Sequence, residues 1–173
     1  MPANPFEPVK HVSTAKQRLW LACLGYAPIH CADNVSARAC FEHASQTRLY
    51  QQPVNAGQVE MATTLGLDLA NQRDCHGAAG LLYRVSMCAG WVYSVWRHLR
   101  QGSEGRYDTE SLPYQYAVAI AKEMERLQLF SHIENAATTG ASHGDVFFRM
   151  GSKQRAIAYI FVVDYLRSYG FLQ

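Results

Sequence analysis

The fold is decided by residues 76–101, which read HGAAGLLYRVSMCAGWVYSVWRHLRQ. Apolar side chains recur in this stretch with alternating spacings of four and three residues, at Leu81, Val85, Cys88, Val92, Val95 and Leu99. That spacing is typical of a helix that packs lengthwise against its neighbours. We therefore expect a long central helix over residues 76–101.

Further segments of helical length lie on both sides of this helix. Gly, Pro and Asn residues separate them, and polar residues stand where helix caps are needed, Ser13 or Thr14 before one segment and Asp33 or Asn34 before the next. The sequence therefore predicts an all-α fold, a compact bundle of about six helices. The expected helices beside the central one cover residues 13–25, 33–51, 58–71, 111–127 and 152–169. Residues 1–12 are expected to form a flexible arm, and residues 13–173 a single helical domain.

For two segments the sequence does not decide between a helix and another secondary structure. Residues 131–151 break the helical pattern and contain a short apolar piece, 146–148, that suits a strand or an extended loop. Residues 157–163 are rich in β-branched and aromatic side chains, so a buried strand is an alternative there. We prefer a helix for this segment because of its length and its polar ends.

Composition and charge exclude several classes of protein. The chain has 173 residues and a net charge of +2, and its 16 basic residues are scattered, which argues against nucleic-acid binding. No stretch approaches the ~20 apolar residues of a membrane-spanning helix, and the first residues do not resemble a signal peptide. The five cysteines show no C-x-x-C spacing. We expect a cytoplasmic protein with reduced thiols and no membrane contact.

The sequence Asp74-Cys75-His76-Gly77 precedes the central helix and is the strongest hint of catalysis. A thiol at a helix N-terminus faces the positive end of the helix dipole, which lowers its pKa and favours the thiolate. A cysteine hydrolase could pair Cys75 with His143 or His132, with Asp145 orienting the histidine ring. In the alternative interpretation, Asp74 caps the helix and Cys75 is a small packed residue.

Two short segments resemble the NlpC/P60-type cysteine peptidases. Residues 74–77 are similar to the D-C-x-G signature in which the family's cysteine begins a central helix, and residues 144–148 (GDVFF) are similar to its G-D-[LV]-x-F segment. The resemblance implies a nucleophilic Cys75. In that family the catalytic histidine follows the G-D segment, whereas this chain has no histidine beyond His143. The two segments therefore do not assign the family.

A second group of residues carries metal-ligand chemistry. The group consists of His30, Cys31, Cys40 and His43. Cys40 and His43 are three apart and share a helix face, so with the preceding pair they could supply four zinc ligands. In the alternative, Cys40 is packed and His43 faces solvent. The sequence contains no P-loop, dinucleotide-binding glycine pattern or H-E-x-x-H motif, and we expect no cofactor.

Aromatic and arginine side chains on the central helix suggest a binding surface. They lie off the apolar seam, at Tyr83, Trp91, Tyr93, Arg97 and Arg100. Tyrosine, tryptophan and arginine are enriched at protein interfaces; in the alternative, the aromatic rings face covering helices. We expect a small accessory or inhibitory protein, of bacterial or phage type, that binds a protein partner. The apolar last helix also suggests a homodimer.

Overall fold

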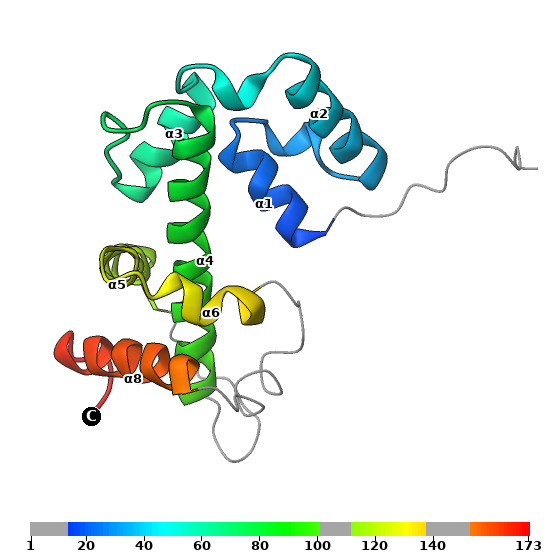
Figure 1. The fold of residues 1–173 in the computed structure, drawn as a ribbon. Helices are drawn as coiled ribbons and strands as arrows, with labels where there is room; N and C mark the ends of the chain where they lie inside the picture. The colour runs from blue at the N-terminus through cyan, green and yellow to red at the C-terminus, as the bar shows by residue number, and fades with distance from the viewer. Residues whose placement is uncertain (1–13, 101–111, 138–152) are drawn as a thin grey trace, which may run out of the picture. The chain divides into compact units, whose positions relative to one another are not determined.

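The computed structural model describes residues 14–100, 112–137 and 153–173 (Figure 1). Within these ranges the chain forms seven α-helices and two short 3-10 helices, and it has no β-strand, which confirms the all-α prediction. The helices are α1 (Ala15–Cys23), η1 (Pro28–His30), α2 (Asn34–Gln46), η2 (Leu49–Gln51), α3 (Ala56–Leu65), α4 (Cys75–Arg100), α5 (Tyr114–Arg126), α6 (Phe130–Ala137) and α8 (Lys153–Ser168).

The chain divides into two compact units, Met1–Tyr83 and Arg84–Gln173. The first unit contains α1, α2, α3 and the beginning of α4; the second contains the rest of α4 with α5, α6 and α8. The single domain expected over residues 13–173 stays a prediction. The arm expected at 1–12 and the strand considered at 146–148 lie outside the described residues.

Polar side chains fix the starts of the helices in the first unit. The Thr14 hydroxyl accepts a hydrogen bond from the Gln17 amide (3.1 Å), and the Gln17 side chain accepts one from the Thr14 amide (3.0 Å). Asp33 accepts from the amide of Ser36 (2.8 Å). Each bond satisfies an amide that has no partner inside its helix. These caps confirm the predicted starts of α1 and α2, and α1 packs against α2 and α3.

Helix α3 ends earlier than the sequence predicted. We expected it to continue to residue 71, but it stops at Leu65 because Gly66 adopts the left-handed conformation (φ +61°). The amide of Leu67 then donates to the carbonyl of Ala62 (2.8 Å), a turn that closes the helix end. The chain that follows is free to fold back beside α3.

Helix α4 confirms the predicted long helix, but it is buried more widely than the predicted seam. Val85, Cys88, Val92 and Val95 are fully buried, as expected. Leu81 is only half-buried, and Leu82 takes its place in the core. Side chains off the seam are buried as well: Ala78, Ala79, Tyr83, Met87, Ala89, Trp91 and Trp96. Such burial on several sides is typical of a helix enclosed by several neighbours.

The second unit is built around the amphipathic helix α5. Its buried side carries Ala117, Ile120, Ala121 and Met124, each fully buried, while Lys122 is exposed. Arg84 on α4 donates to the Glu125 carboxylate on α5 (2.8 Å). The buried apolar side of α5 and this ion pair hold α5 against α4.

The sequence interpretation was wrong for α6 and correct for α8. Residues 131–137, which we expected to interrupt the helical pattern, belong to α6, whose Ile133 is fully buried. A helix of eight residues has only about two turns, too few for an apolar period to be recognised in the sequence. The segment 157–163 is helical within α8, not a strand, and α8 packs against α6 and α5.

Candidate functional site

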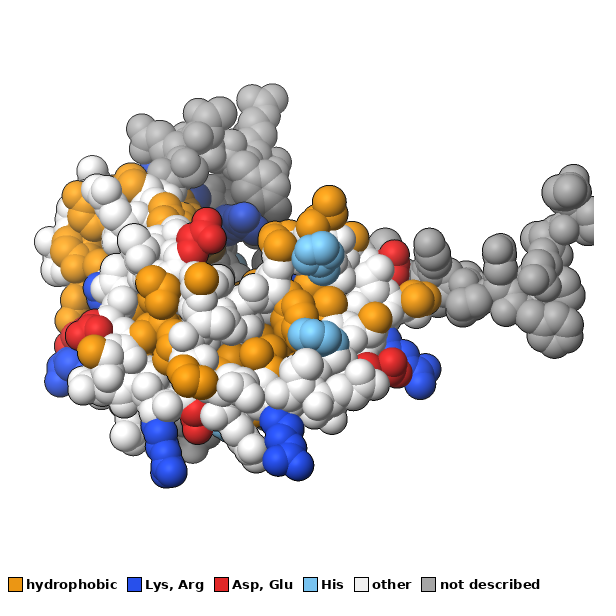
Figure 2. Space-filling view, turned by 90° about the horizontal axis from the view of Figure 1, so that it is seen from above, with side chains coloured by type: hydrophobic (Ala, Val, Ile, Leu, Met, Phe, Trp, Pro, Cys, Tyr) orange, Lys and Arg blue, Asp and Glu red, His pale blue; other side chains and the backbone are white. Residues whose placement is uncertain are grey.

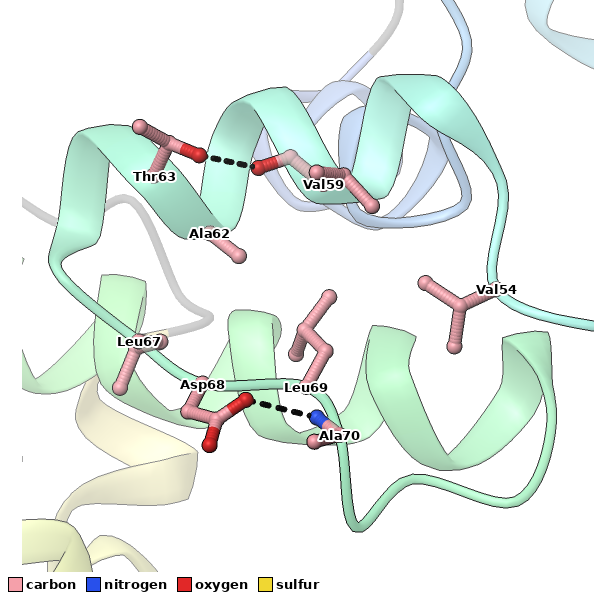
Figure 3. A pocket seen from close by; sticks show the side chains of 8 residues that line it. All are labelled: Val54, Val59, Ala62, Thr63, Leu67, Asp68, Leu69 and Ala70. Atoms are coloured by element: carbon pink, nitrogen blue, oxygen red, sulfur yellow. Dashed lines mark hydrogen bonds between the residues drawn. The ribbon is translucent and has the colours of Figure 1, made fainter.

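The first unit contains an apolar groove beside α3, with a volume of roughly 350 Å³ (Figure 3). Its lining comes from the residue that leads into α3, from α3 itself and from the chain that folds back after Gly66: Val54, Val59, Ala62, Thr63, Leu67, Asp68, Leu69 and Ala70. Figure 3 shows the Leu69 side chain extending toward α3. The early end of α3 therefore creates the groove.

The groove is open to solvent, and its two polar side chains, those of Thr63 and Asp68, form hydrogen bonds with the backbone. Val59 is 52% exposed, so an apolar side chain stands at the surface. The Thr63 hydroxyl donates to the Val59 carbonyl (2.8 Å), and one Asp68 oxygen accepts from the Ala70 amide (2.8 Å). Asp68 is the only ionisable residue of the lining. An aliphatic surface with one carboxylate can hold an apolar side chain and attract a nearby cation, but it offers no acid–base pair.

Cys75, the predicted nucleophile, is the first residue of α4 and is fully buried. Burial raises the pKa of its thiol, although a hydrogen bond with Gln58 acts in the opposite direction. The expectation that this pKa is lowered is wrong, because burial disfavours the charged thiolate and the neighbouring Asp74 carboxylate repels it. Asp74 caps α4 by accepting from the Gly77 amide (2.9 Å), as in the alternative interpretation.

Two polar side chains, that of Asn55 before the first residue of α3 and that of Gln58 in its first turn, contact Cys75 and form what we call the Asn55–Gln58 cluster. Gln58 is fully buried, and its amide nitrogen donates to the carbonyls of Cys23 (2.9 Å) and Cys75 (2.8 Å). Asn55 donates to the Leu24 carbonyl (2.9 Å) and to the Cys75 sulfur (3.7 Å). The cluster therefore joins the end of α1, the start of α3 and the start of α4.

Two of the proposed catalytic partners of Cys75 are not described, and the third belongs to the other unit. His143 and Asp145 lie outside those residues. His132 belongs to α6 in the second unit, where its Nδ1 atom is buried without a hydrogen-bond partner among the described residues. A catalytic role of Cys75 therefore stays a prediction that rests on its position at the start of α4.

We expect the native cysteines to react slowly with thiol reagents. All five are buried and none is in a disulfide. Burial raises the pKa of Cys23 and of Cys88 to about 12. Each unit of pKa lowers the thiolate fraction about tenfold, so at pH 7 alkylation of Cys23 and Cys88 should be at least about a hundredfold slower than that of a free thiol. Timed iodoacetamide labelling with peptide mapping measures these rates.

The exposed Ser45 provides the control for this measurement. A Ser45→Cys variant should be alkylated at the rate of a free thiol, and denaturant should release all five native cysteines. Fast labelling of Cys75 in the native protein at pH 6–7 would contradict the prediction and restore the hydrolase hypothesis.

The metal-site candidates do not form a ligand cluster. The Cys40 thiol donates to the His30 backbone carbonyl (3.3 Å), and the Cys31 thiol donates to the Ala27 carbonyl (3.6 Å). The His43 ring is hydrogen-bonded to the Tyr26 hydroxyl (2.8 Å), and His30 is exposed. Across residues 14–100, 112–137 and 153–173, no group of three or more potential ligands is arranged to hold a metal ion.

The expected aromatic surface of α4 is largely in the core. Tyr83 is buried and meets the ring of Trp20 edge-on (5.5 Å between centroids), and Trp91 is buried as well. The burial of these two rings agrees with the alternative interpretation, in which the rings face covering helices.

The other three predicted binding residues differ in exposure. Tyr93 is half-buried, Arg97 is exposed, and the guanidinium of Arg100 lies 4.7 Å from the centroid of the Trp96 ring. A guanidinium at that distance is held by a cation–π interaction. A role of these residues in binding stays a prediction.

The charged side chains visible in Figure 2 are scattered. Lys and Arg side chains are spread over this face, some of them next to Asp or Glu side chains, and form no continuous basic patch there. No helix within the described ranges is both long and apolar enough to cross a membrane. Comparisons with models of known protein families, with curated proteins and with solved structures found no match to this chain.

Proposed function

We propose that this chain is a small accessory or inhibitory protein that binds a protein partner through the groove beside α3 and catalyses no reaction. The groove carries the proposal: an exposed aliphatic surface beside a single carboxylate suits an apolar side chain of a partner, with a basic residue next to it. A small-molecule site is less well supported, because such sites enclose most of the ligand and aim free polar groups at it.

Two further observations support this proposal. The most suggestive nucleophile, Cys75, is buried with a raised pKa. The five thiols are free of disulfides, which fits the reducing cytoplasm that we propose for this protein. A bacterial or phage source belongs to the same proposal and rests on general grounds alone.

A photo-crosslinking amino acid at Val59 tests the groove directly. In the cells that express the protein, we expect this probe to give a discrete adduct with one partner, while the same probe at the exposed Ser45 gives none. Asp68→Lys should lower the yield at Val59 by about threefold or more, because it reverses the charge offered to the partner. Glu42→Lys, the same charge change on α2, should leave the yield unchanged.

The proposal is refuted if Val59 and Ser45 give the same adducts. It is also refuted if Asp68→Lys and Glu42→Lys affect the yield equally, since the groove would then have no special part in binding.

A further inference from the structure

Helix α8 carries apolar residues on opposite sides. Its inner side is formed by Ala158, Val162 and Leu166, all fully buried. On the outer side Ile157 is 51% exposed and Ile160 is 56% exposed. Large aliphatic side chains on the water side of a helix gain free energy when a partner covers them.

The outer side of α8 has the spacing of a helix-pairing seam. Five of the exposed residues of α8 follow one another at steps of four and three: Lys153, Ile157, Ile160, Asp164 and Arg167. We call these five residues the α8 outer seam. A heptad-type spacing matches the packing of one helix along another. The two isoleucines are central in this seam, and charged residues flank them.

We propose that the α8 outer seam binds the same seam of a second copy of this chain, with the two α8 helices antiparallel about a two-fold axis. This interface is separate from the groove beside α3, so it goes beyond the proposed function. Dimers of this kind use one self-complementary surface in both copies.

The charges of the seam determine the direction and the register of the pair. Lys153 lies four residues before Ile157, and Asp164 lies four residues after Ile160. When Ile157 of one copy faces Ile160 of the other in an antiparallel pair, Lys153 of each copy faces Asp164 of the other. A parallel pair in register would place Lys153 against Lys153 and Asp164 against Asp164, which is repulsive.

Asp164 can accept the additional contact. Its only ion pair among the described residues is a long one with Arg167 (3.8 Å), in which both side chains are mostly exposed. Exposed pairs of this kind contribute little stability, so the Asp164 carboxylate can reorient toward a lysine of a second copy. The dimer then contains two Lys153–Asp164 ion pairs between the copies, one at each end of the isoleucine contact.

The interface is small, so the dimer should be weak. A helix of 16 residues is about 24 Å long, and one helix face buries less than the roughly 800 Å² per partner of a standard interface. We therefore expect a monomer at low micromolar concentration and a large fraction of dimer at a few hundred micromolar.

Sedimentation equilibrium of the purified full chain, from about 5 to 500 µM, tests the proposal. We expect concentration-dependent dimers, and Ile160→Asp should raise the dissociation constant at least about tenfold. Ile29→Asp is the matched control: Ile29 is 80% exposed in the first unit, and its replacement should leave association unchanged. Circular dichroism of these variants, both at exposed positions, verifies that the helices persist.

A charge exchange tests the register. At low salt, Lys153→Glu and Asp164→Lys should each weaken the dimer by about threefold or more, and both changes in one chain should restore association, since the opposite charges then face each other again. A wild-type chain that stays monomeric over this concentration range overturns the proposal. This holds also if the seam of the monomer is found to bind lipid vesicles. Equal effects of Ile160→Asp and Ile29→Asp, or a double variant no better than the single ones, also overturn it.

Discussion

Replacing Gln58 by leucine is expected to lower the free energy of unfolding by about 3–4 kcal/mol. The side chain is fully buried, and leucine would remove the two hydrogen bonds that Gln58 donates to the carbonyls of Cys23 and Cys75. The Cys23 carbonyl stands at the end of α1, where no later helical amide can reach it. The capping box in which Gln58 accepts from the Asn55 amide (3.2 Å) would also be lost.

Urea denaturation followed by circular dichroism measures this loss. Gln46→Leu is the matched control, because Gln46 is exposed at the end of α2 and its replacement should change the stability by less than about 0.5 kcal/mol. Gln58→Glu should be destabilising near neutral pH, since it buries a carboxylate against two carbonyls, and less so in acid, where the carboxyl is protonated. A Gln58→Leu protein within 1 kcal/mol of the wild type, about a fivefold change in the folding equilibrium, would contradict the argument.

The second large effect is expected at Gly57, in the first turn of α3. A methyl group there would lie 2.5 Å from the Gly25 carbonyl oxygen and 2.8 Å from the Gly25 Cα. Both atoms belong to the backbone, so relief requires the turn after α1 to move away from α3. We expect Gly57→Ala to lower the free energy of unfolding by about 3 kcal/mol or more.

Gly90 in α4 is the matched control for this substitution. A methyl group at Gly90 would have no atom within 4 Å of it. Alanine restricts the unfolded chain and favours the helix, so Gly90→Ala should stabilise the protein by about 0.5–1 kcal/mol. Thermal unfolding of the two variants should shift in opposite directions. Similar shifts would show that the contact between Gly57 and Gly25 has no special importance.

The parts of the fold that follow local rules could be predicted from the sequence. Thr14 and Asp33 cap helices because their side chains reach amides only three residues away, and the period of α4 is long enough to read directly. Gly66 was harder. Its left-handed conformation ends α3 and creates the groove, but the sequence shows only a glycine that weakens a helix.

The candidate sites were less predictable because they depend on burial and on distant segments. Cys75 has the sequence context of a reactive thiol, but Asn55 and Gln58 come from elsewhere in the chain and enclose it. The groove was missed entirely, since Val54, Val59 and Leu69 meet only after the chain folds back on α3. Its one sequence signal is the run of apolar residues after Gly66, at Leu67, Leu69 and Ala70.

The close approach of α1 and α3 restricts how this sequence can change during evolution. Gly25 has a φ of +95°, and a side chain there would overlap the Asn55 amide, while one at Gly57 would overlap the Gly25 backbone. Gly25, Asn55, Gly57 and Gln58 should therefore be retained together or replaced together in homologous proteins. A glycine at the end of the first helix, followed about thirty residues later by N-x-G-Q, is a sequence signature that natural selection can preserve even where the surface helices diverge.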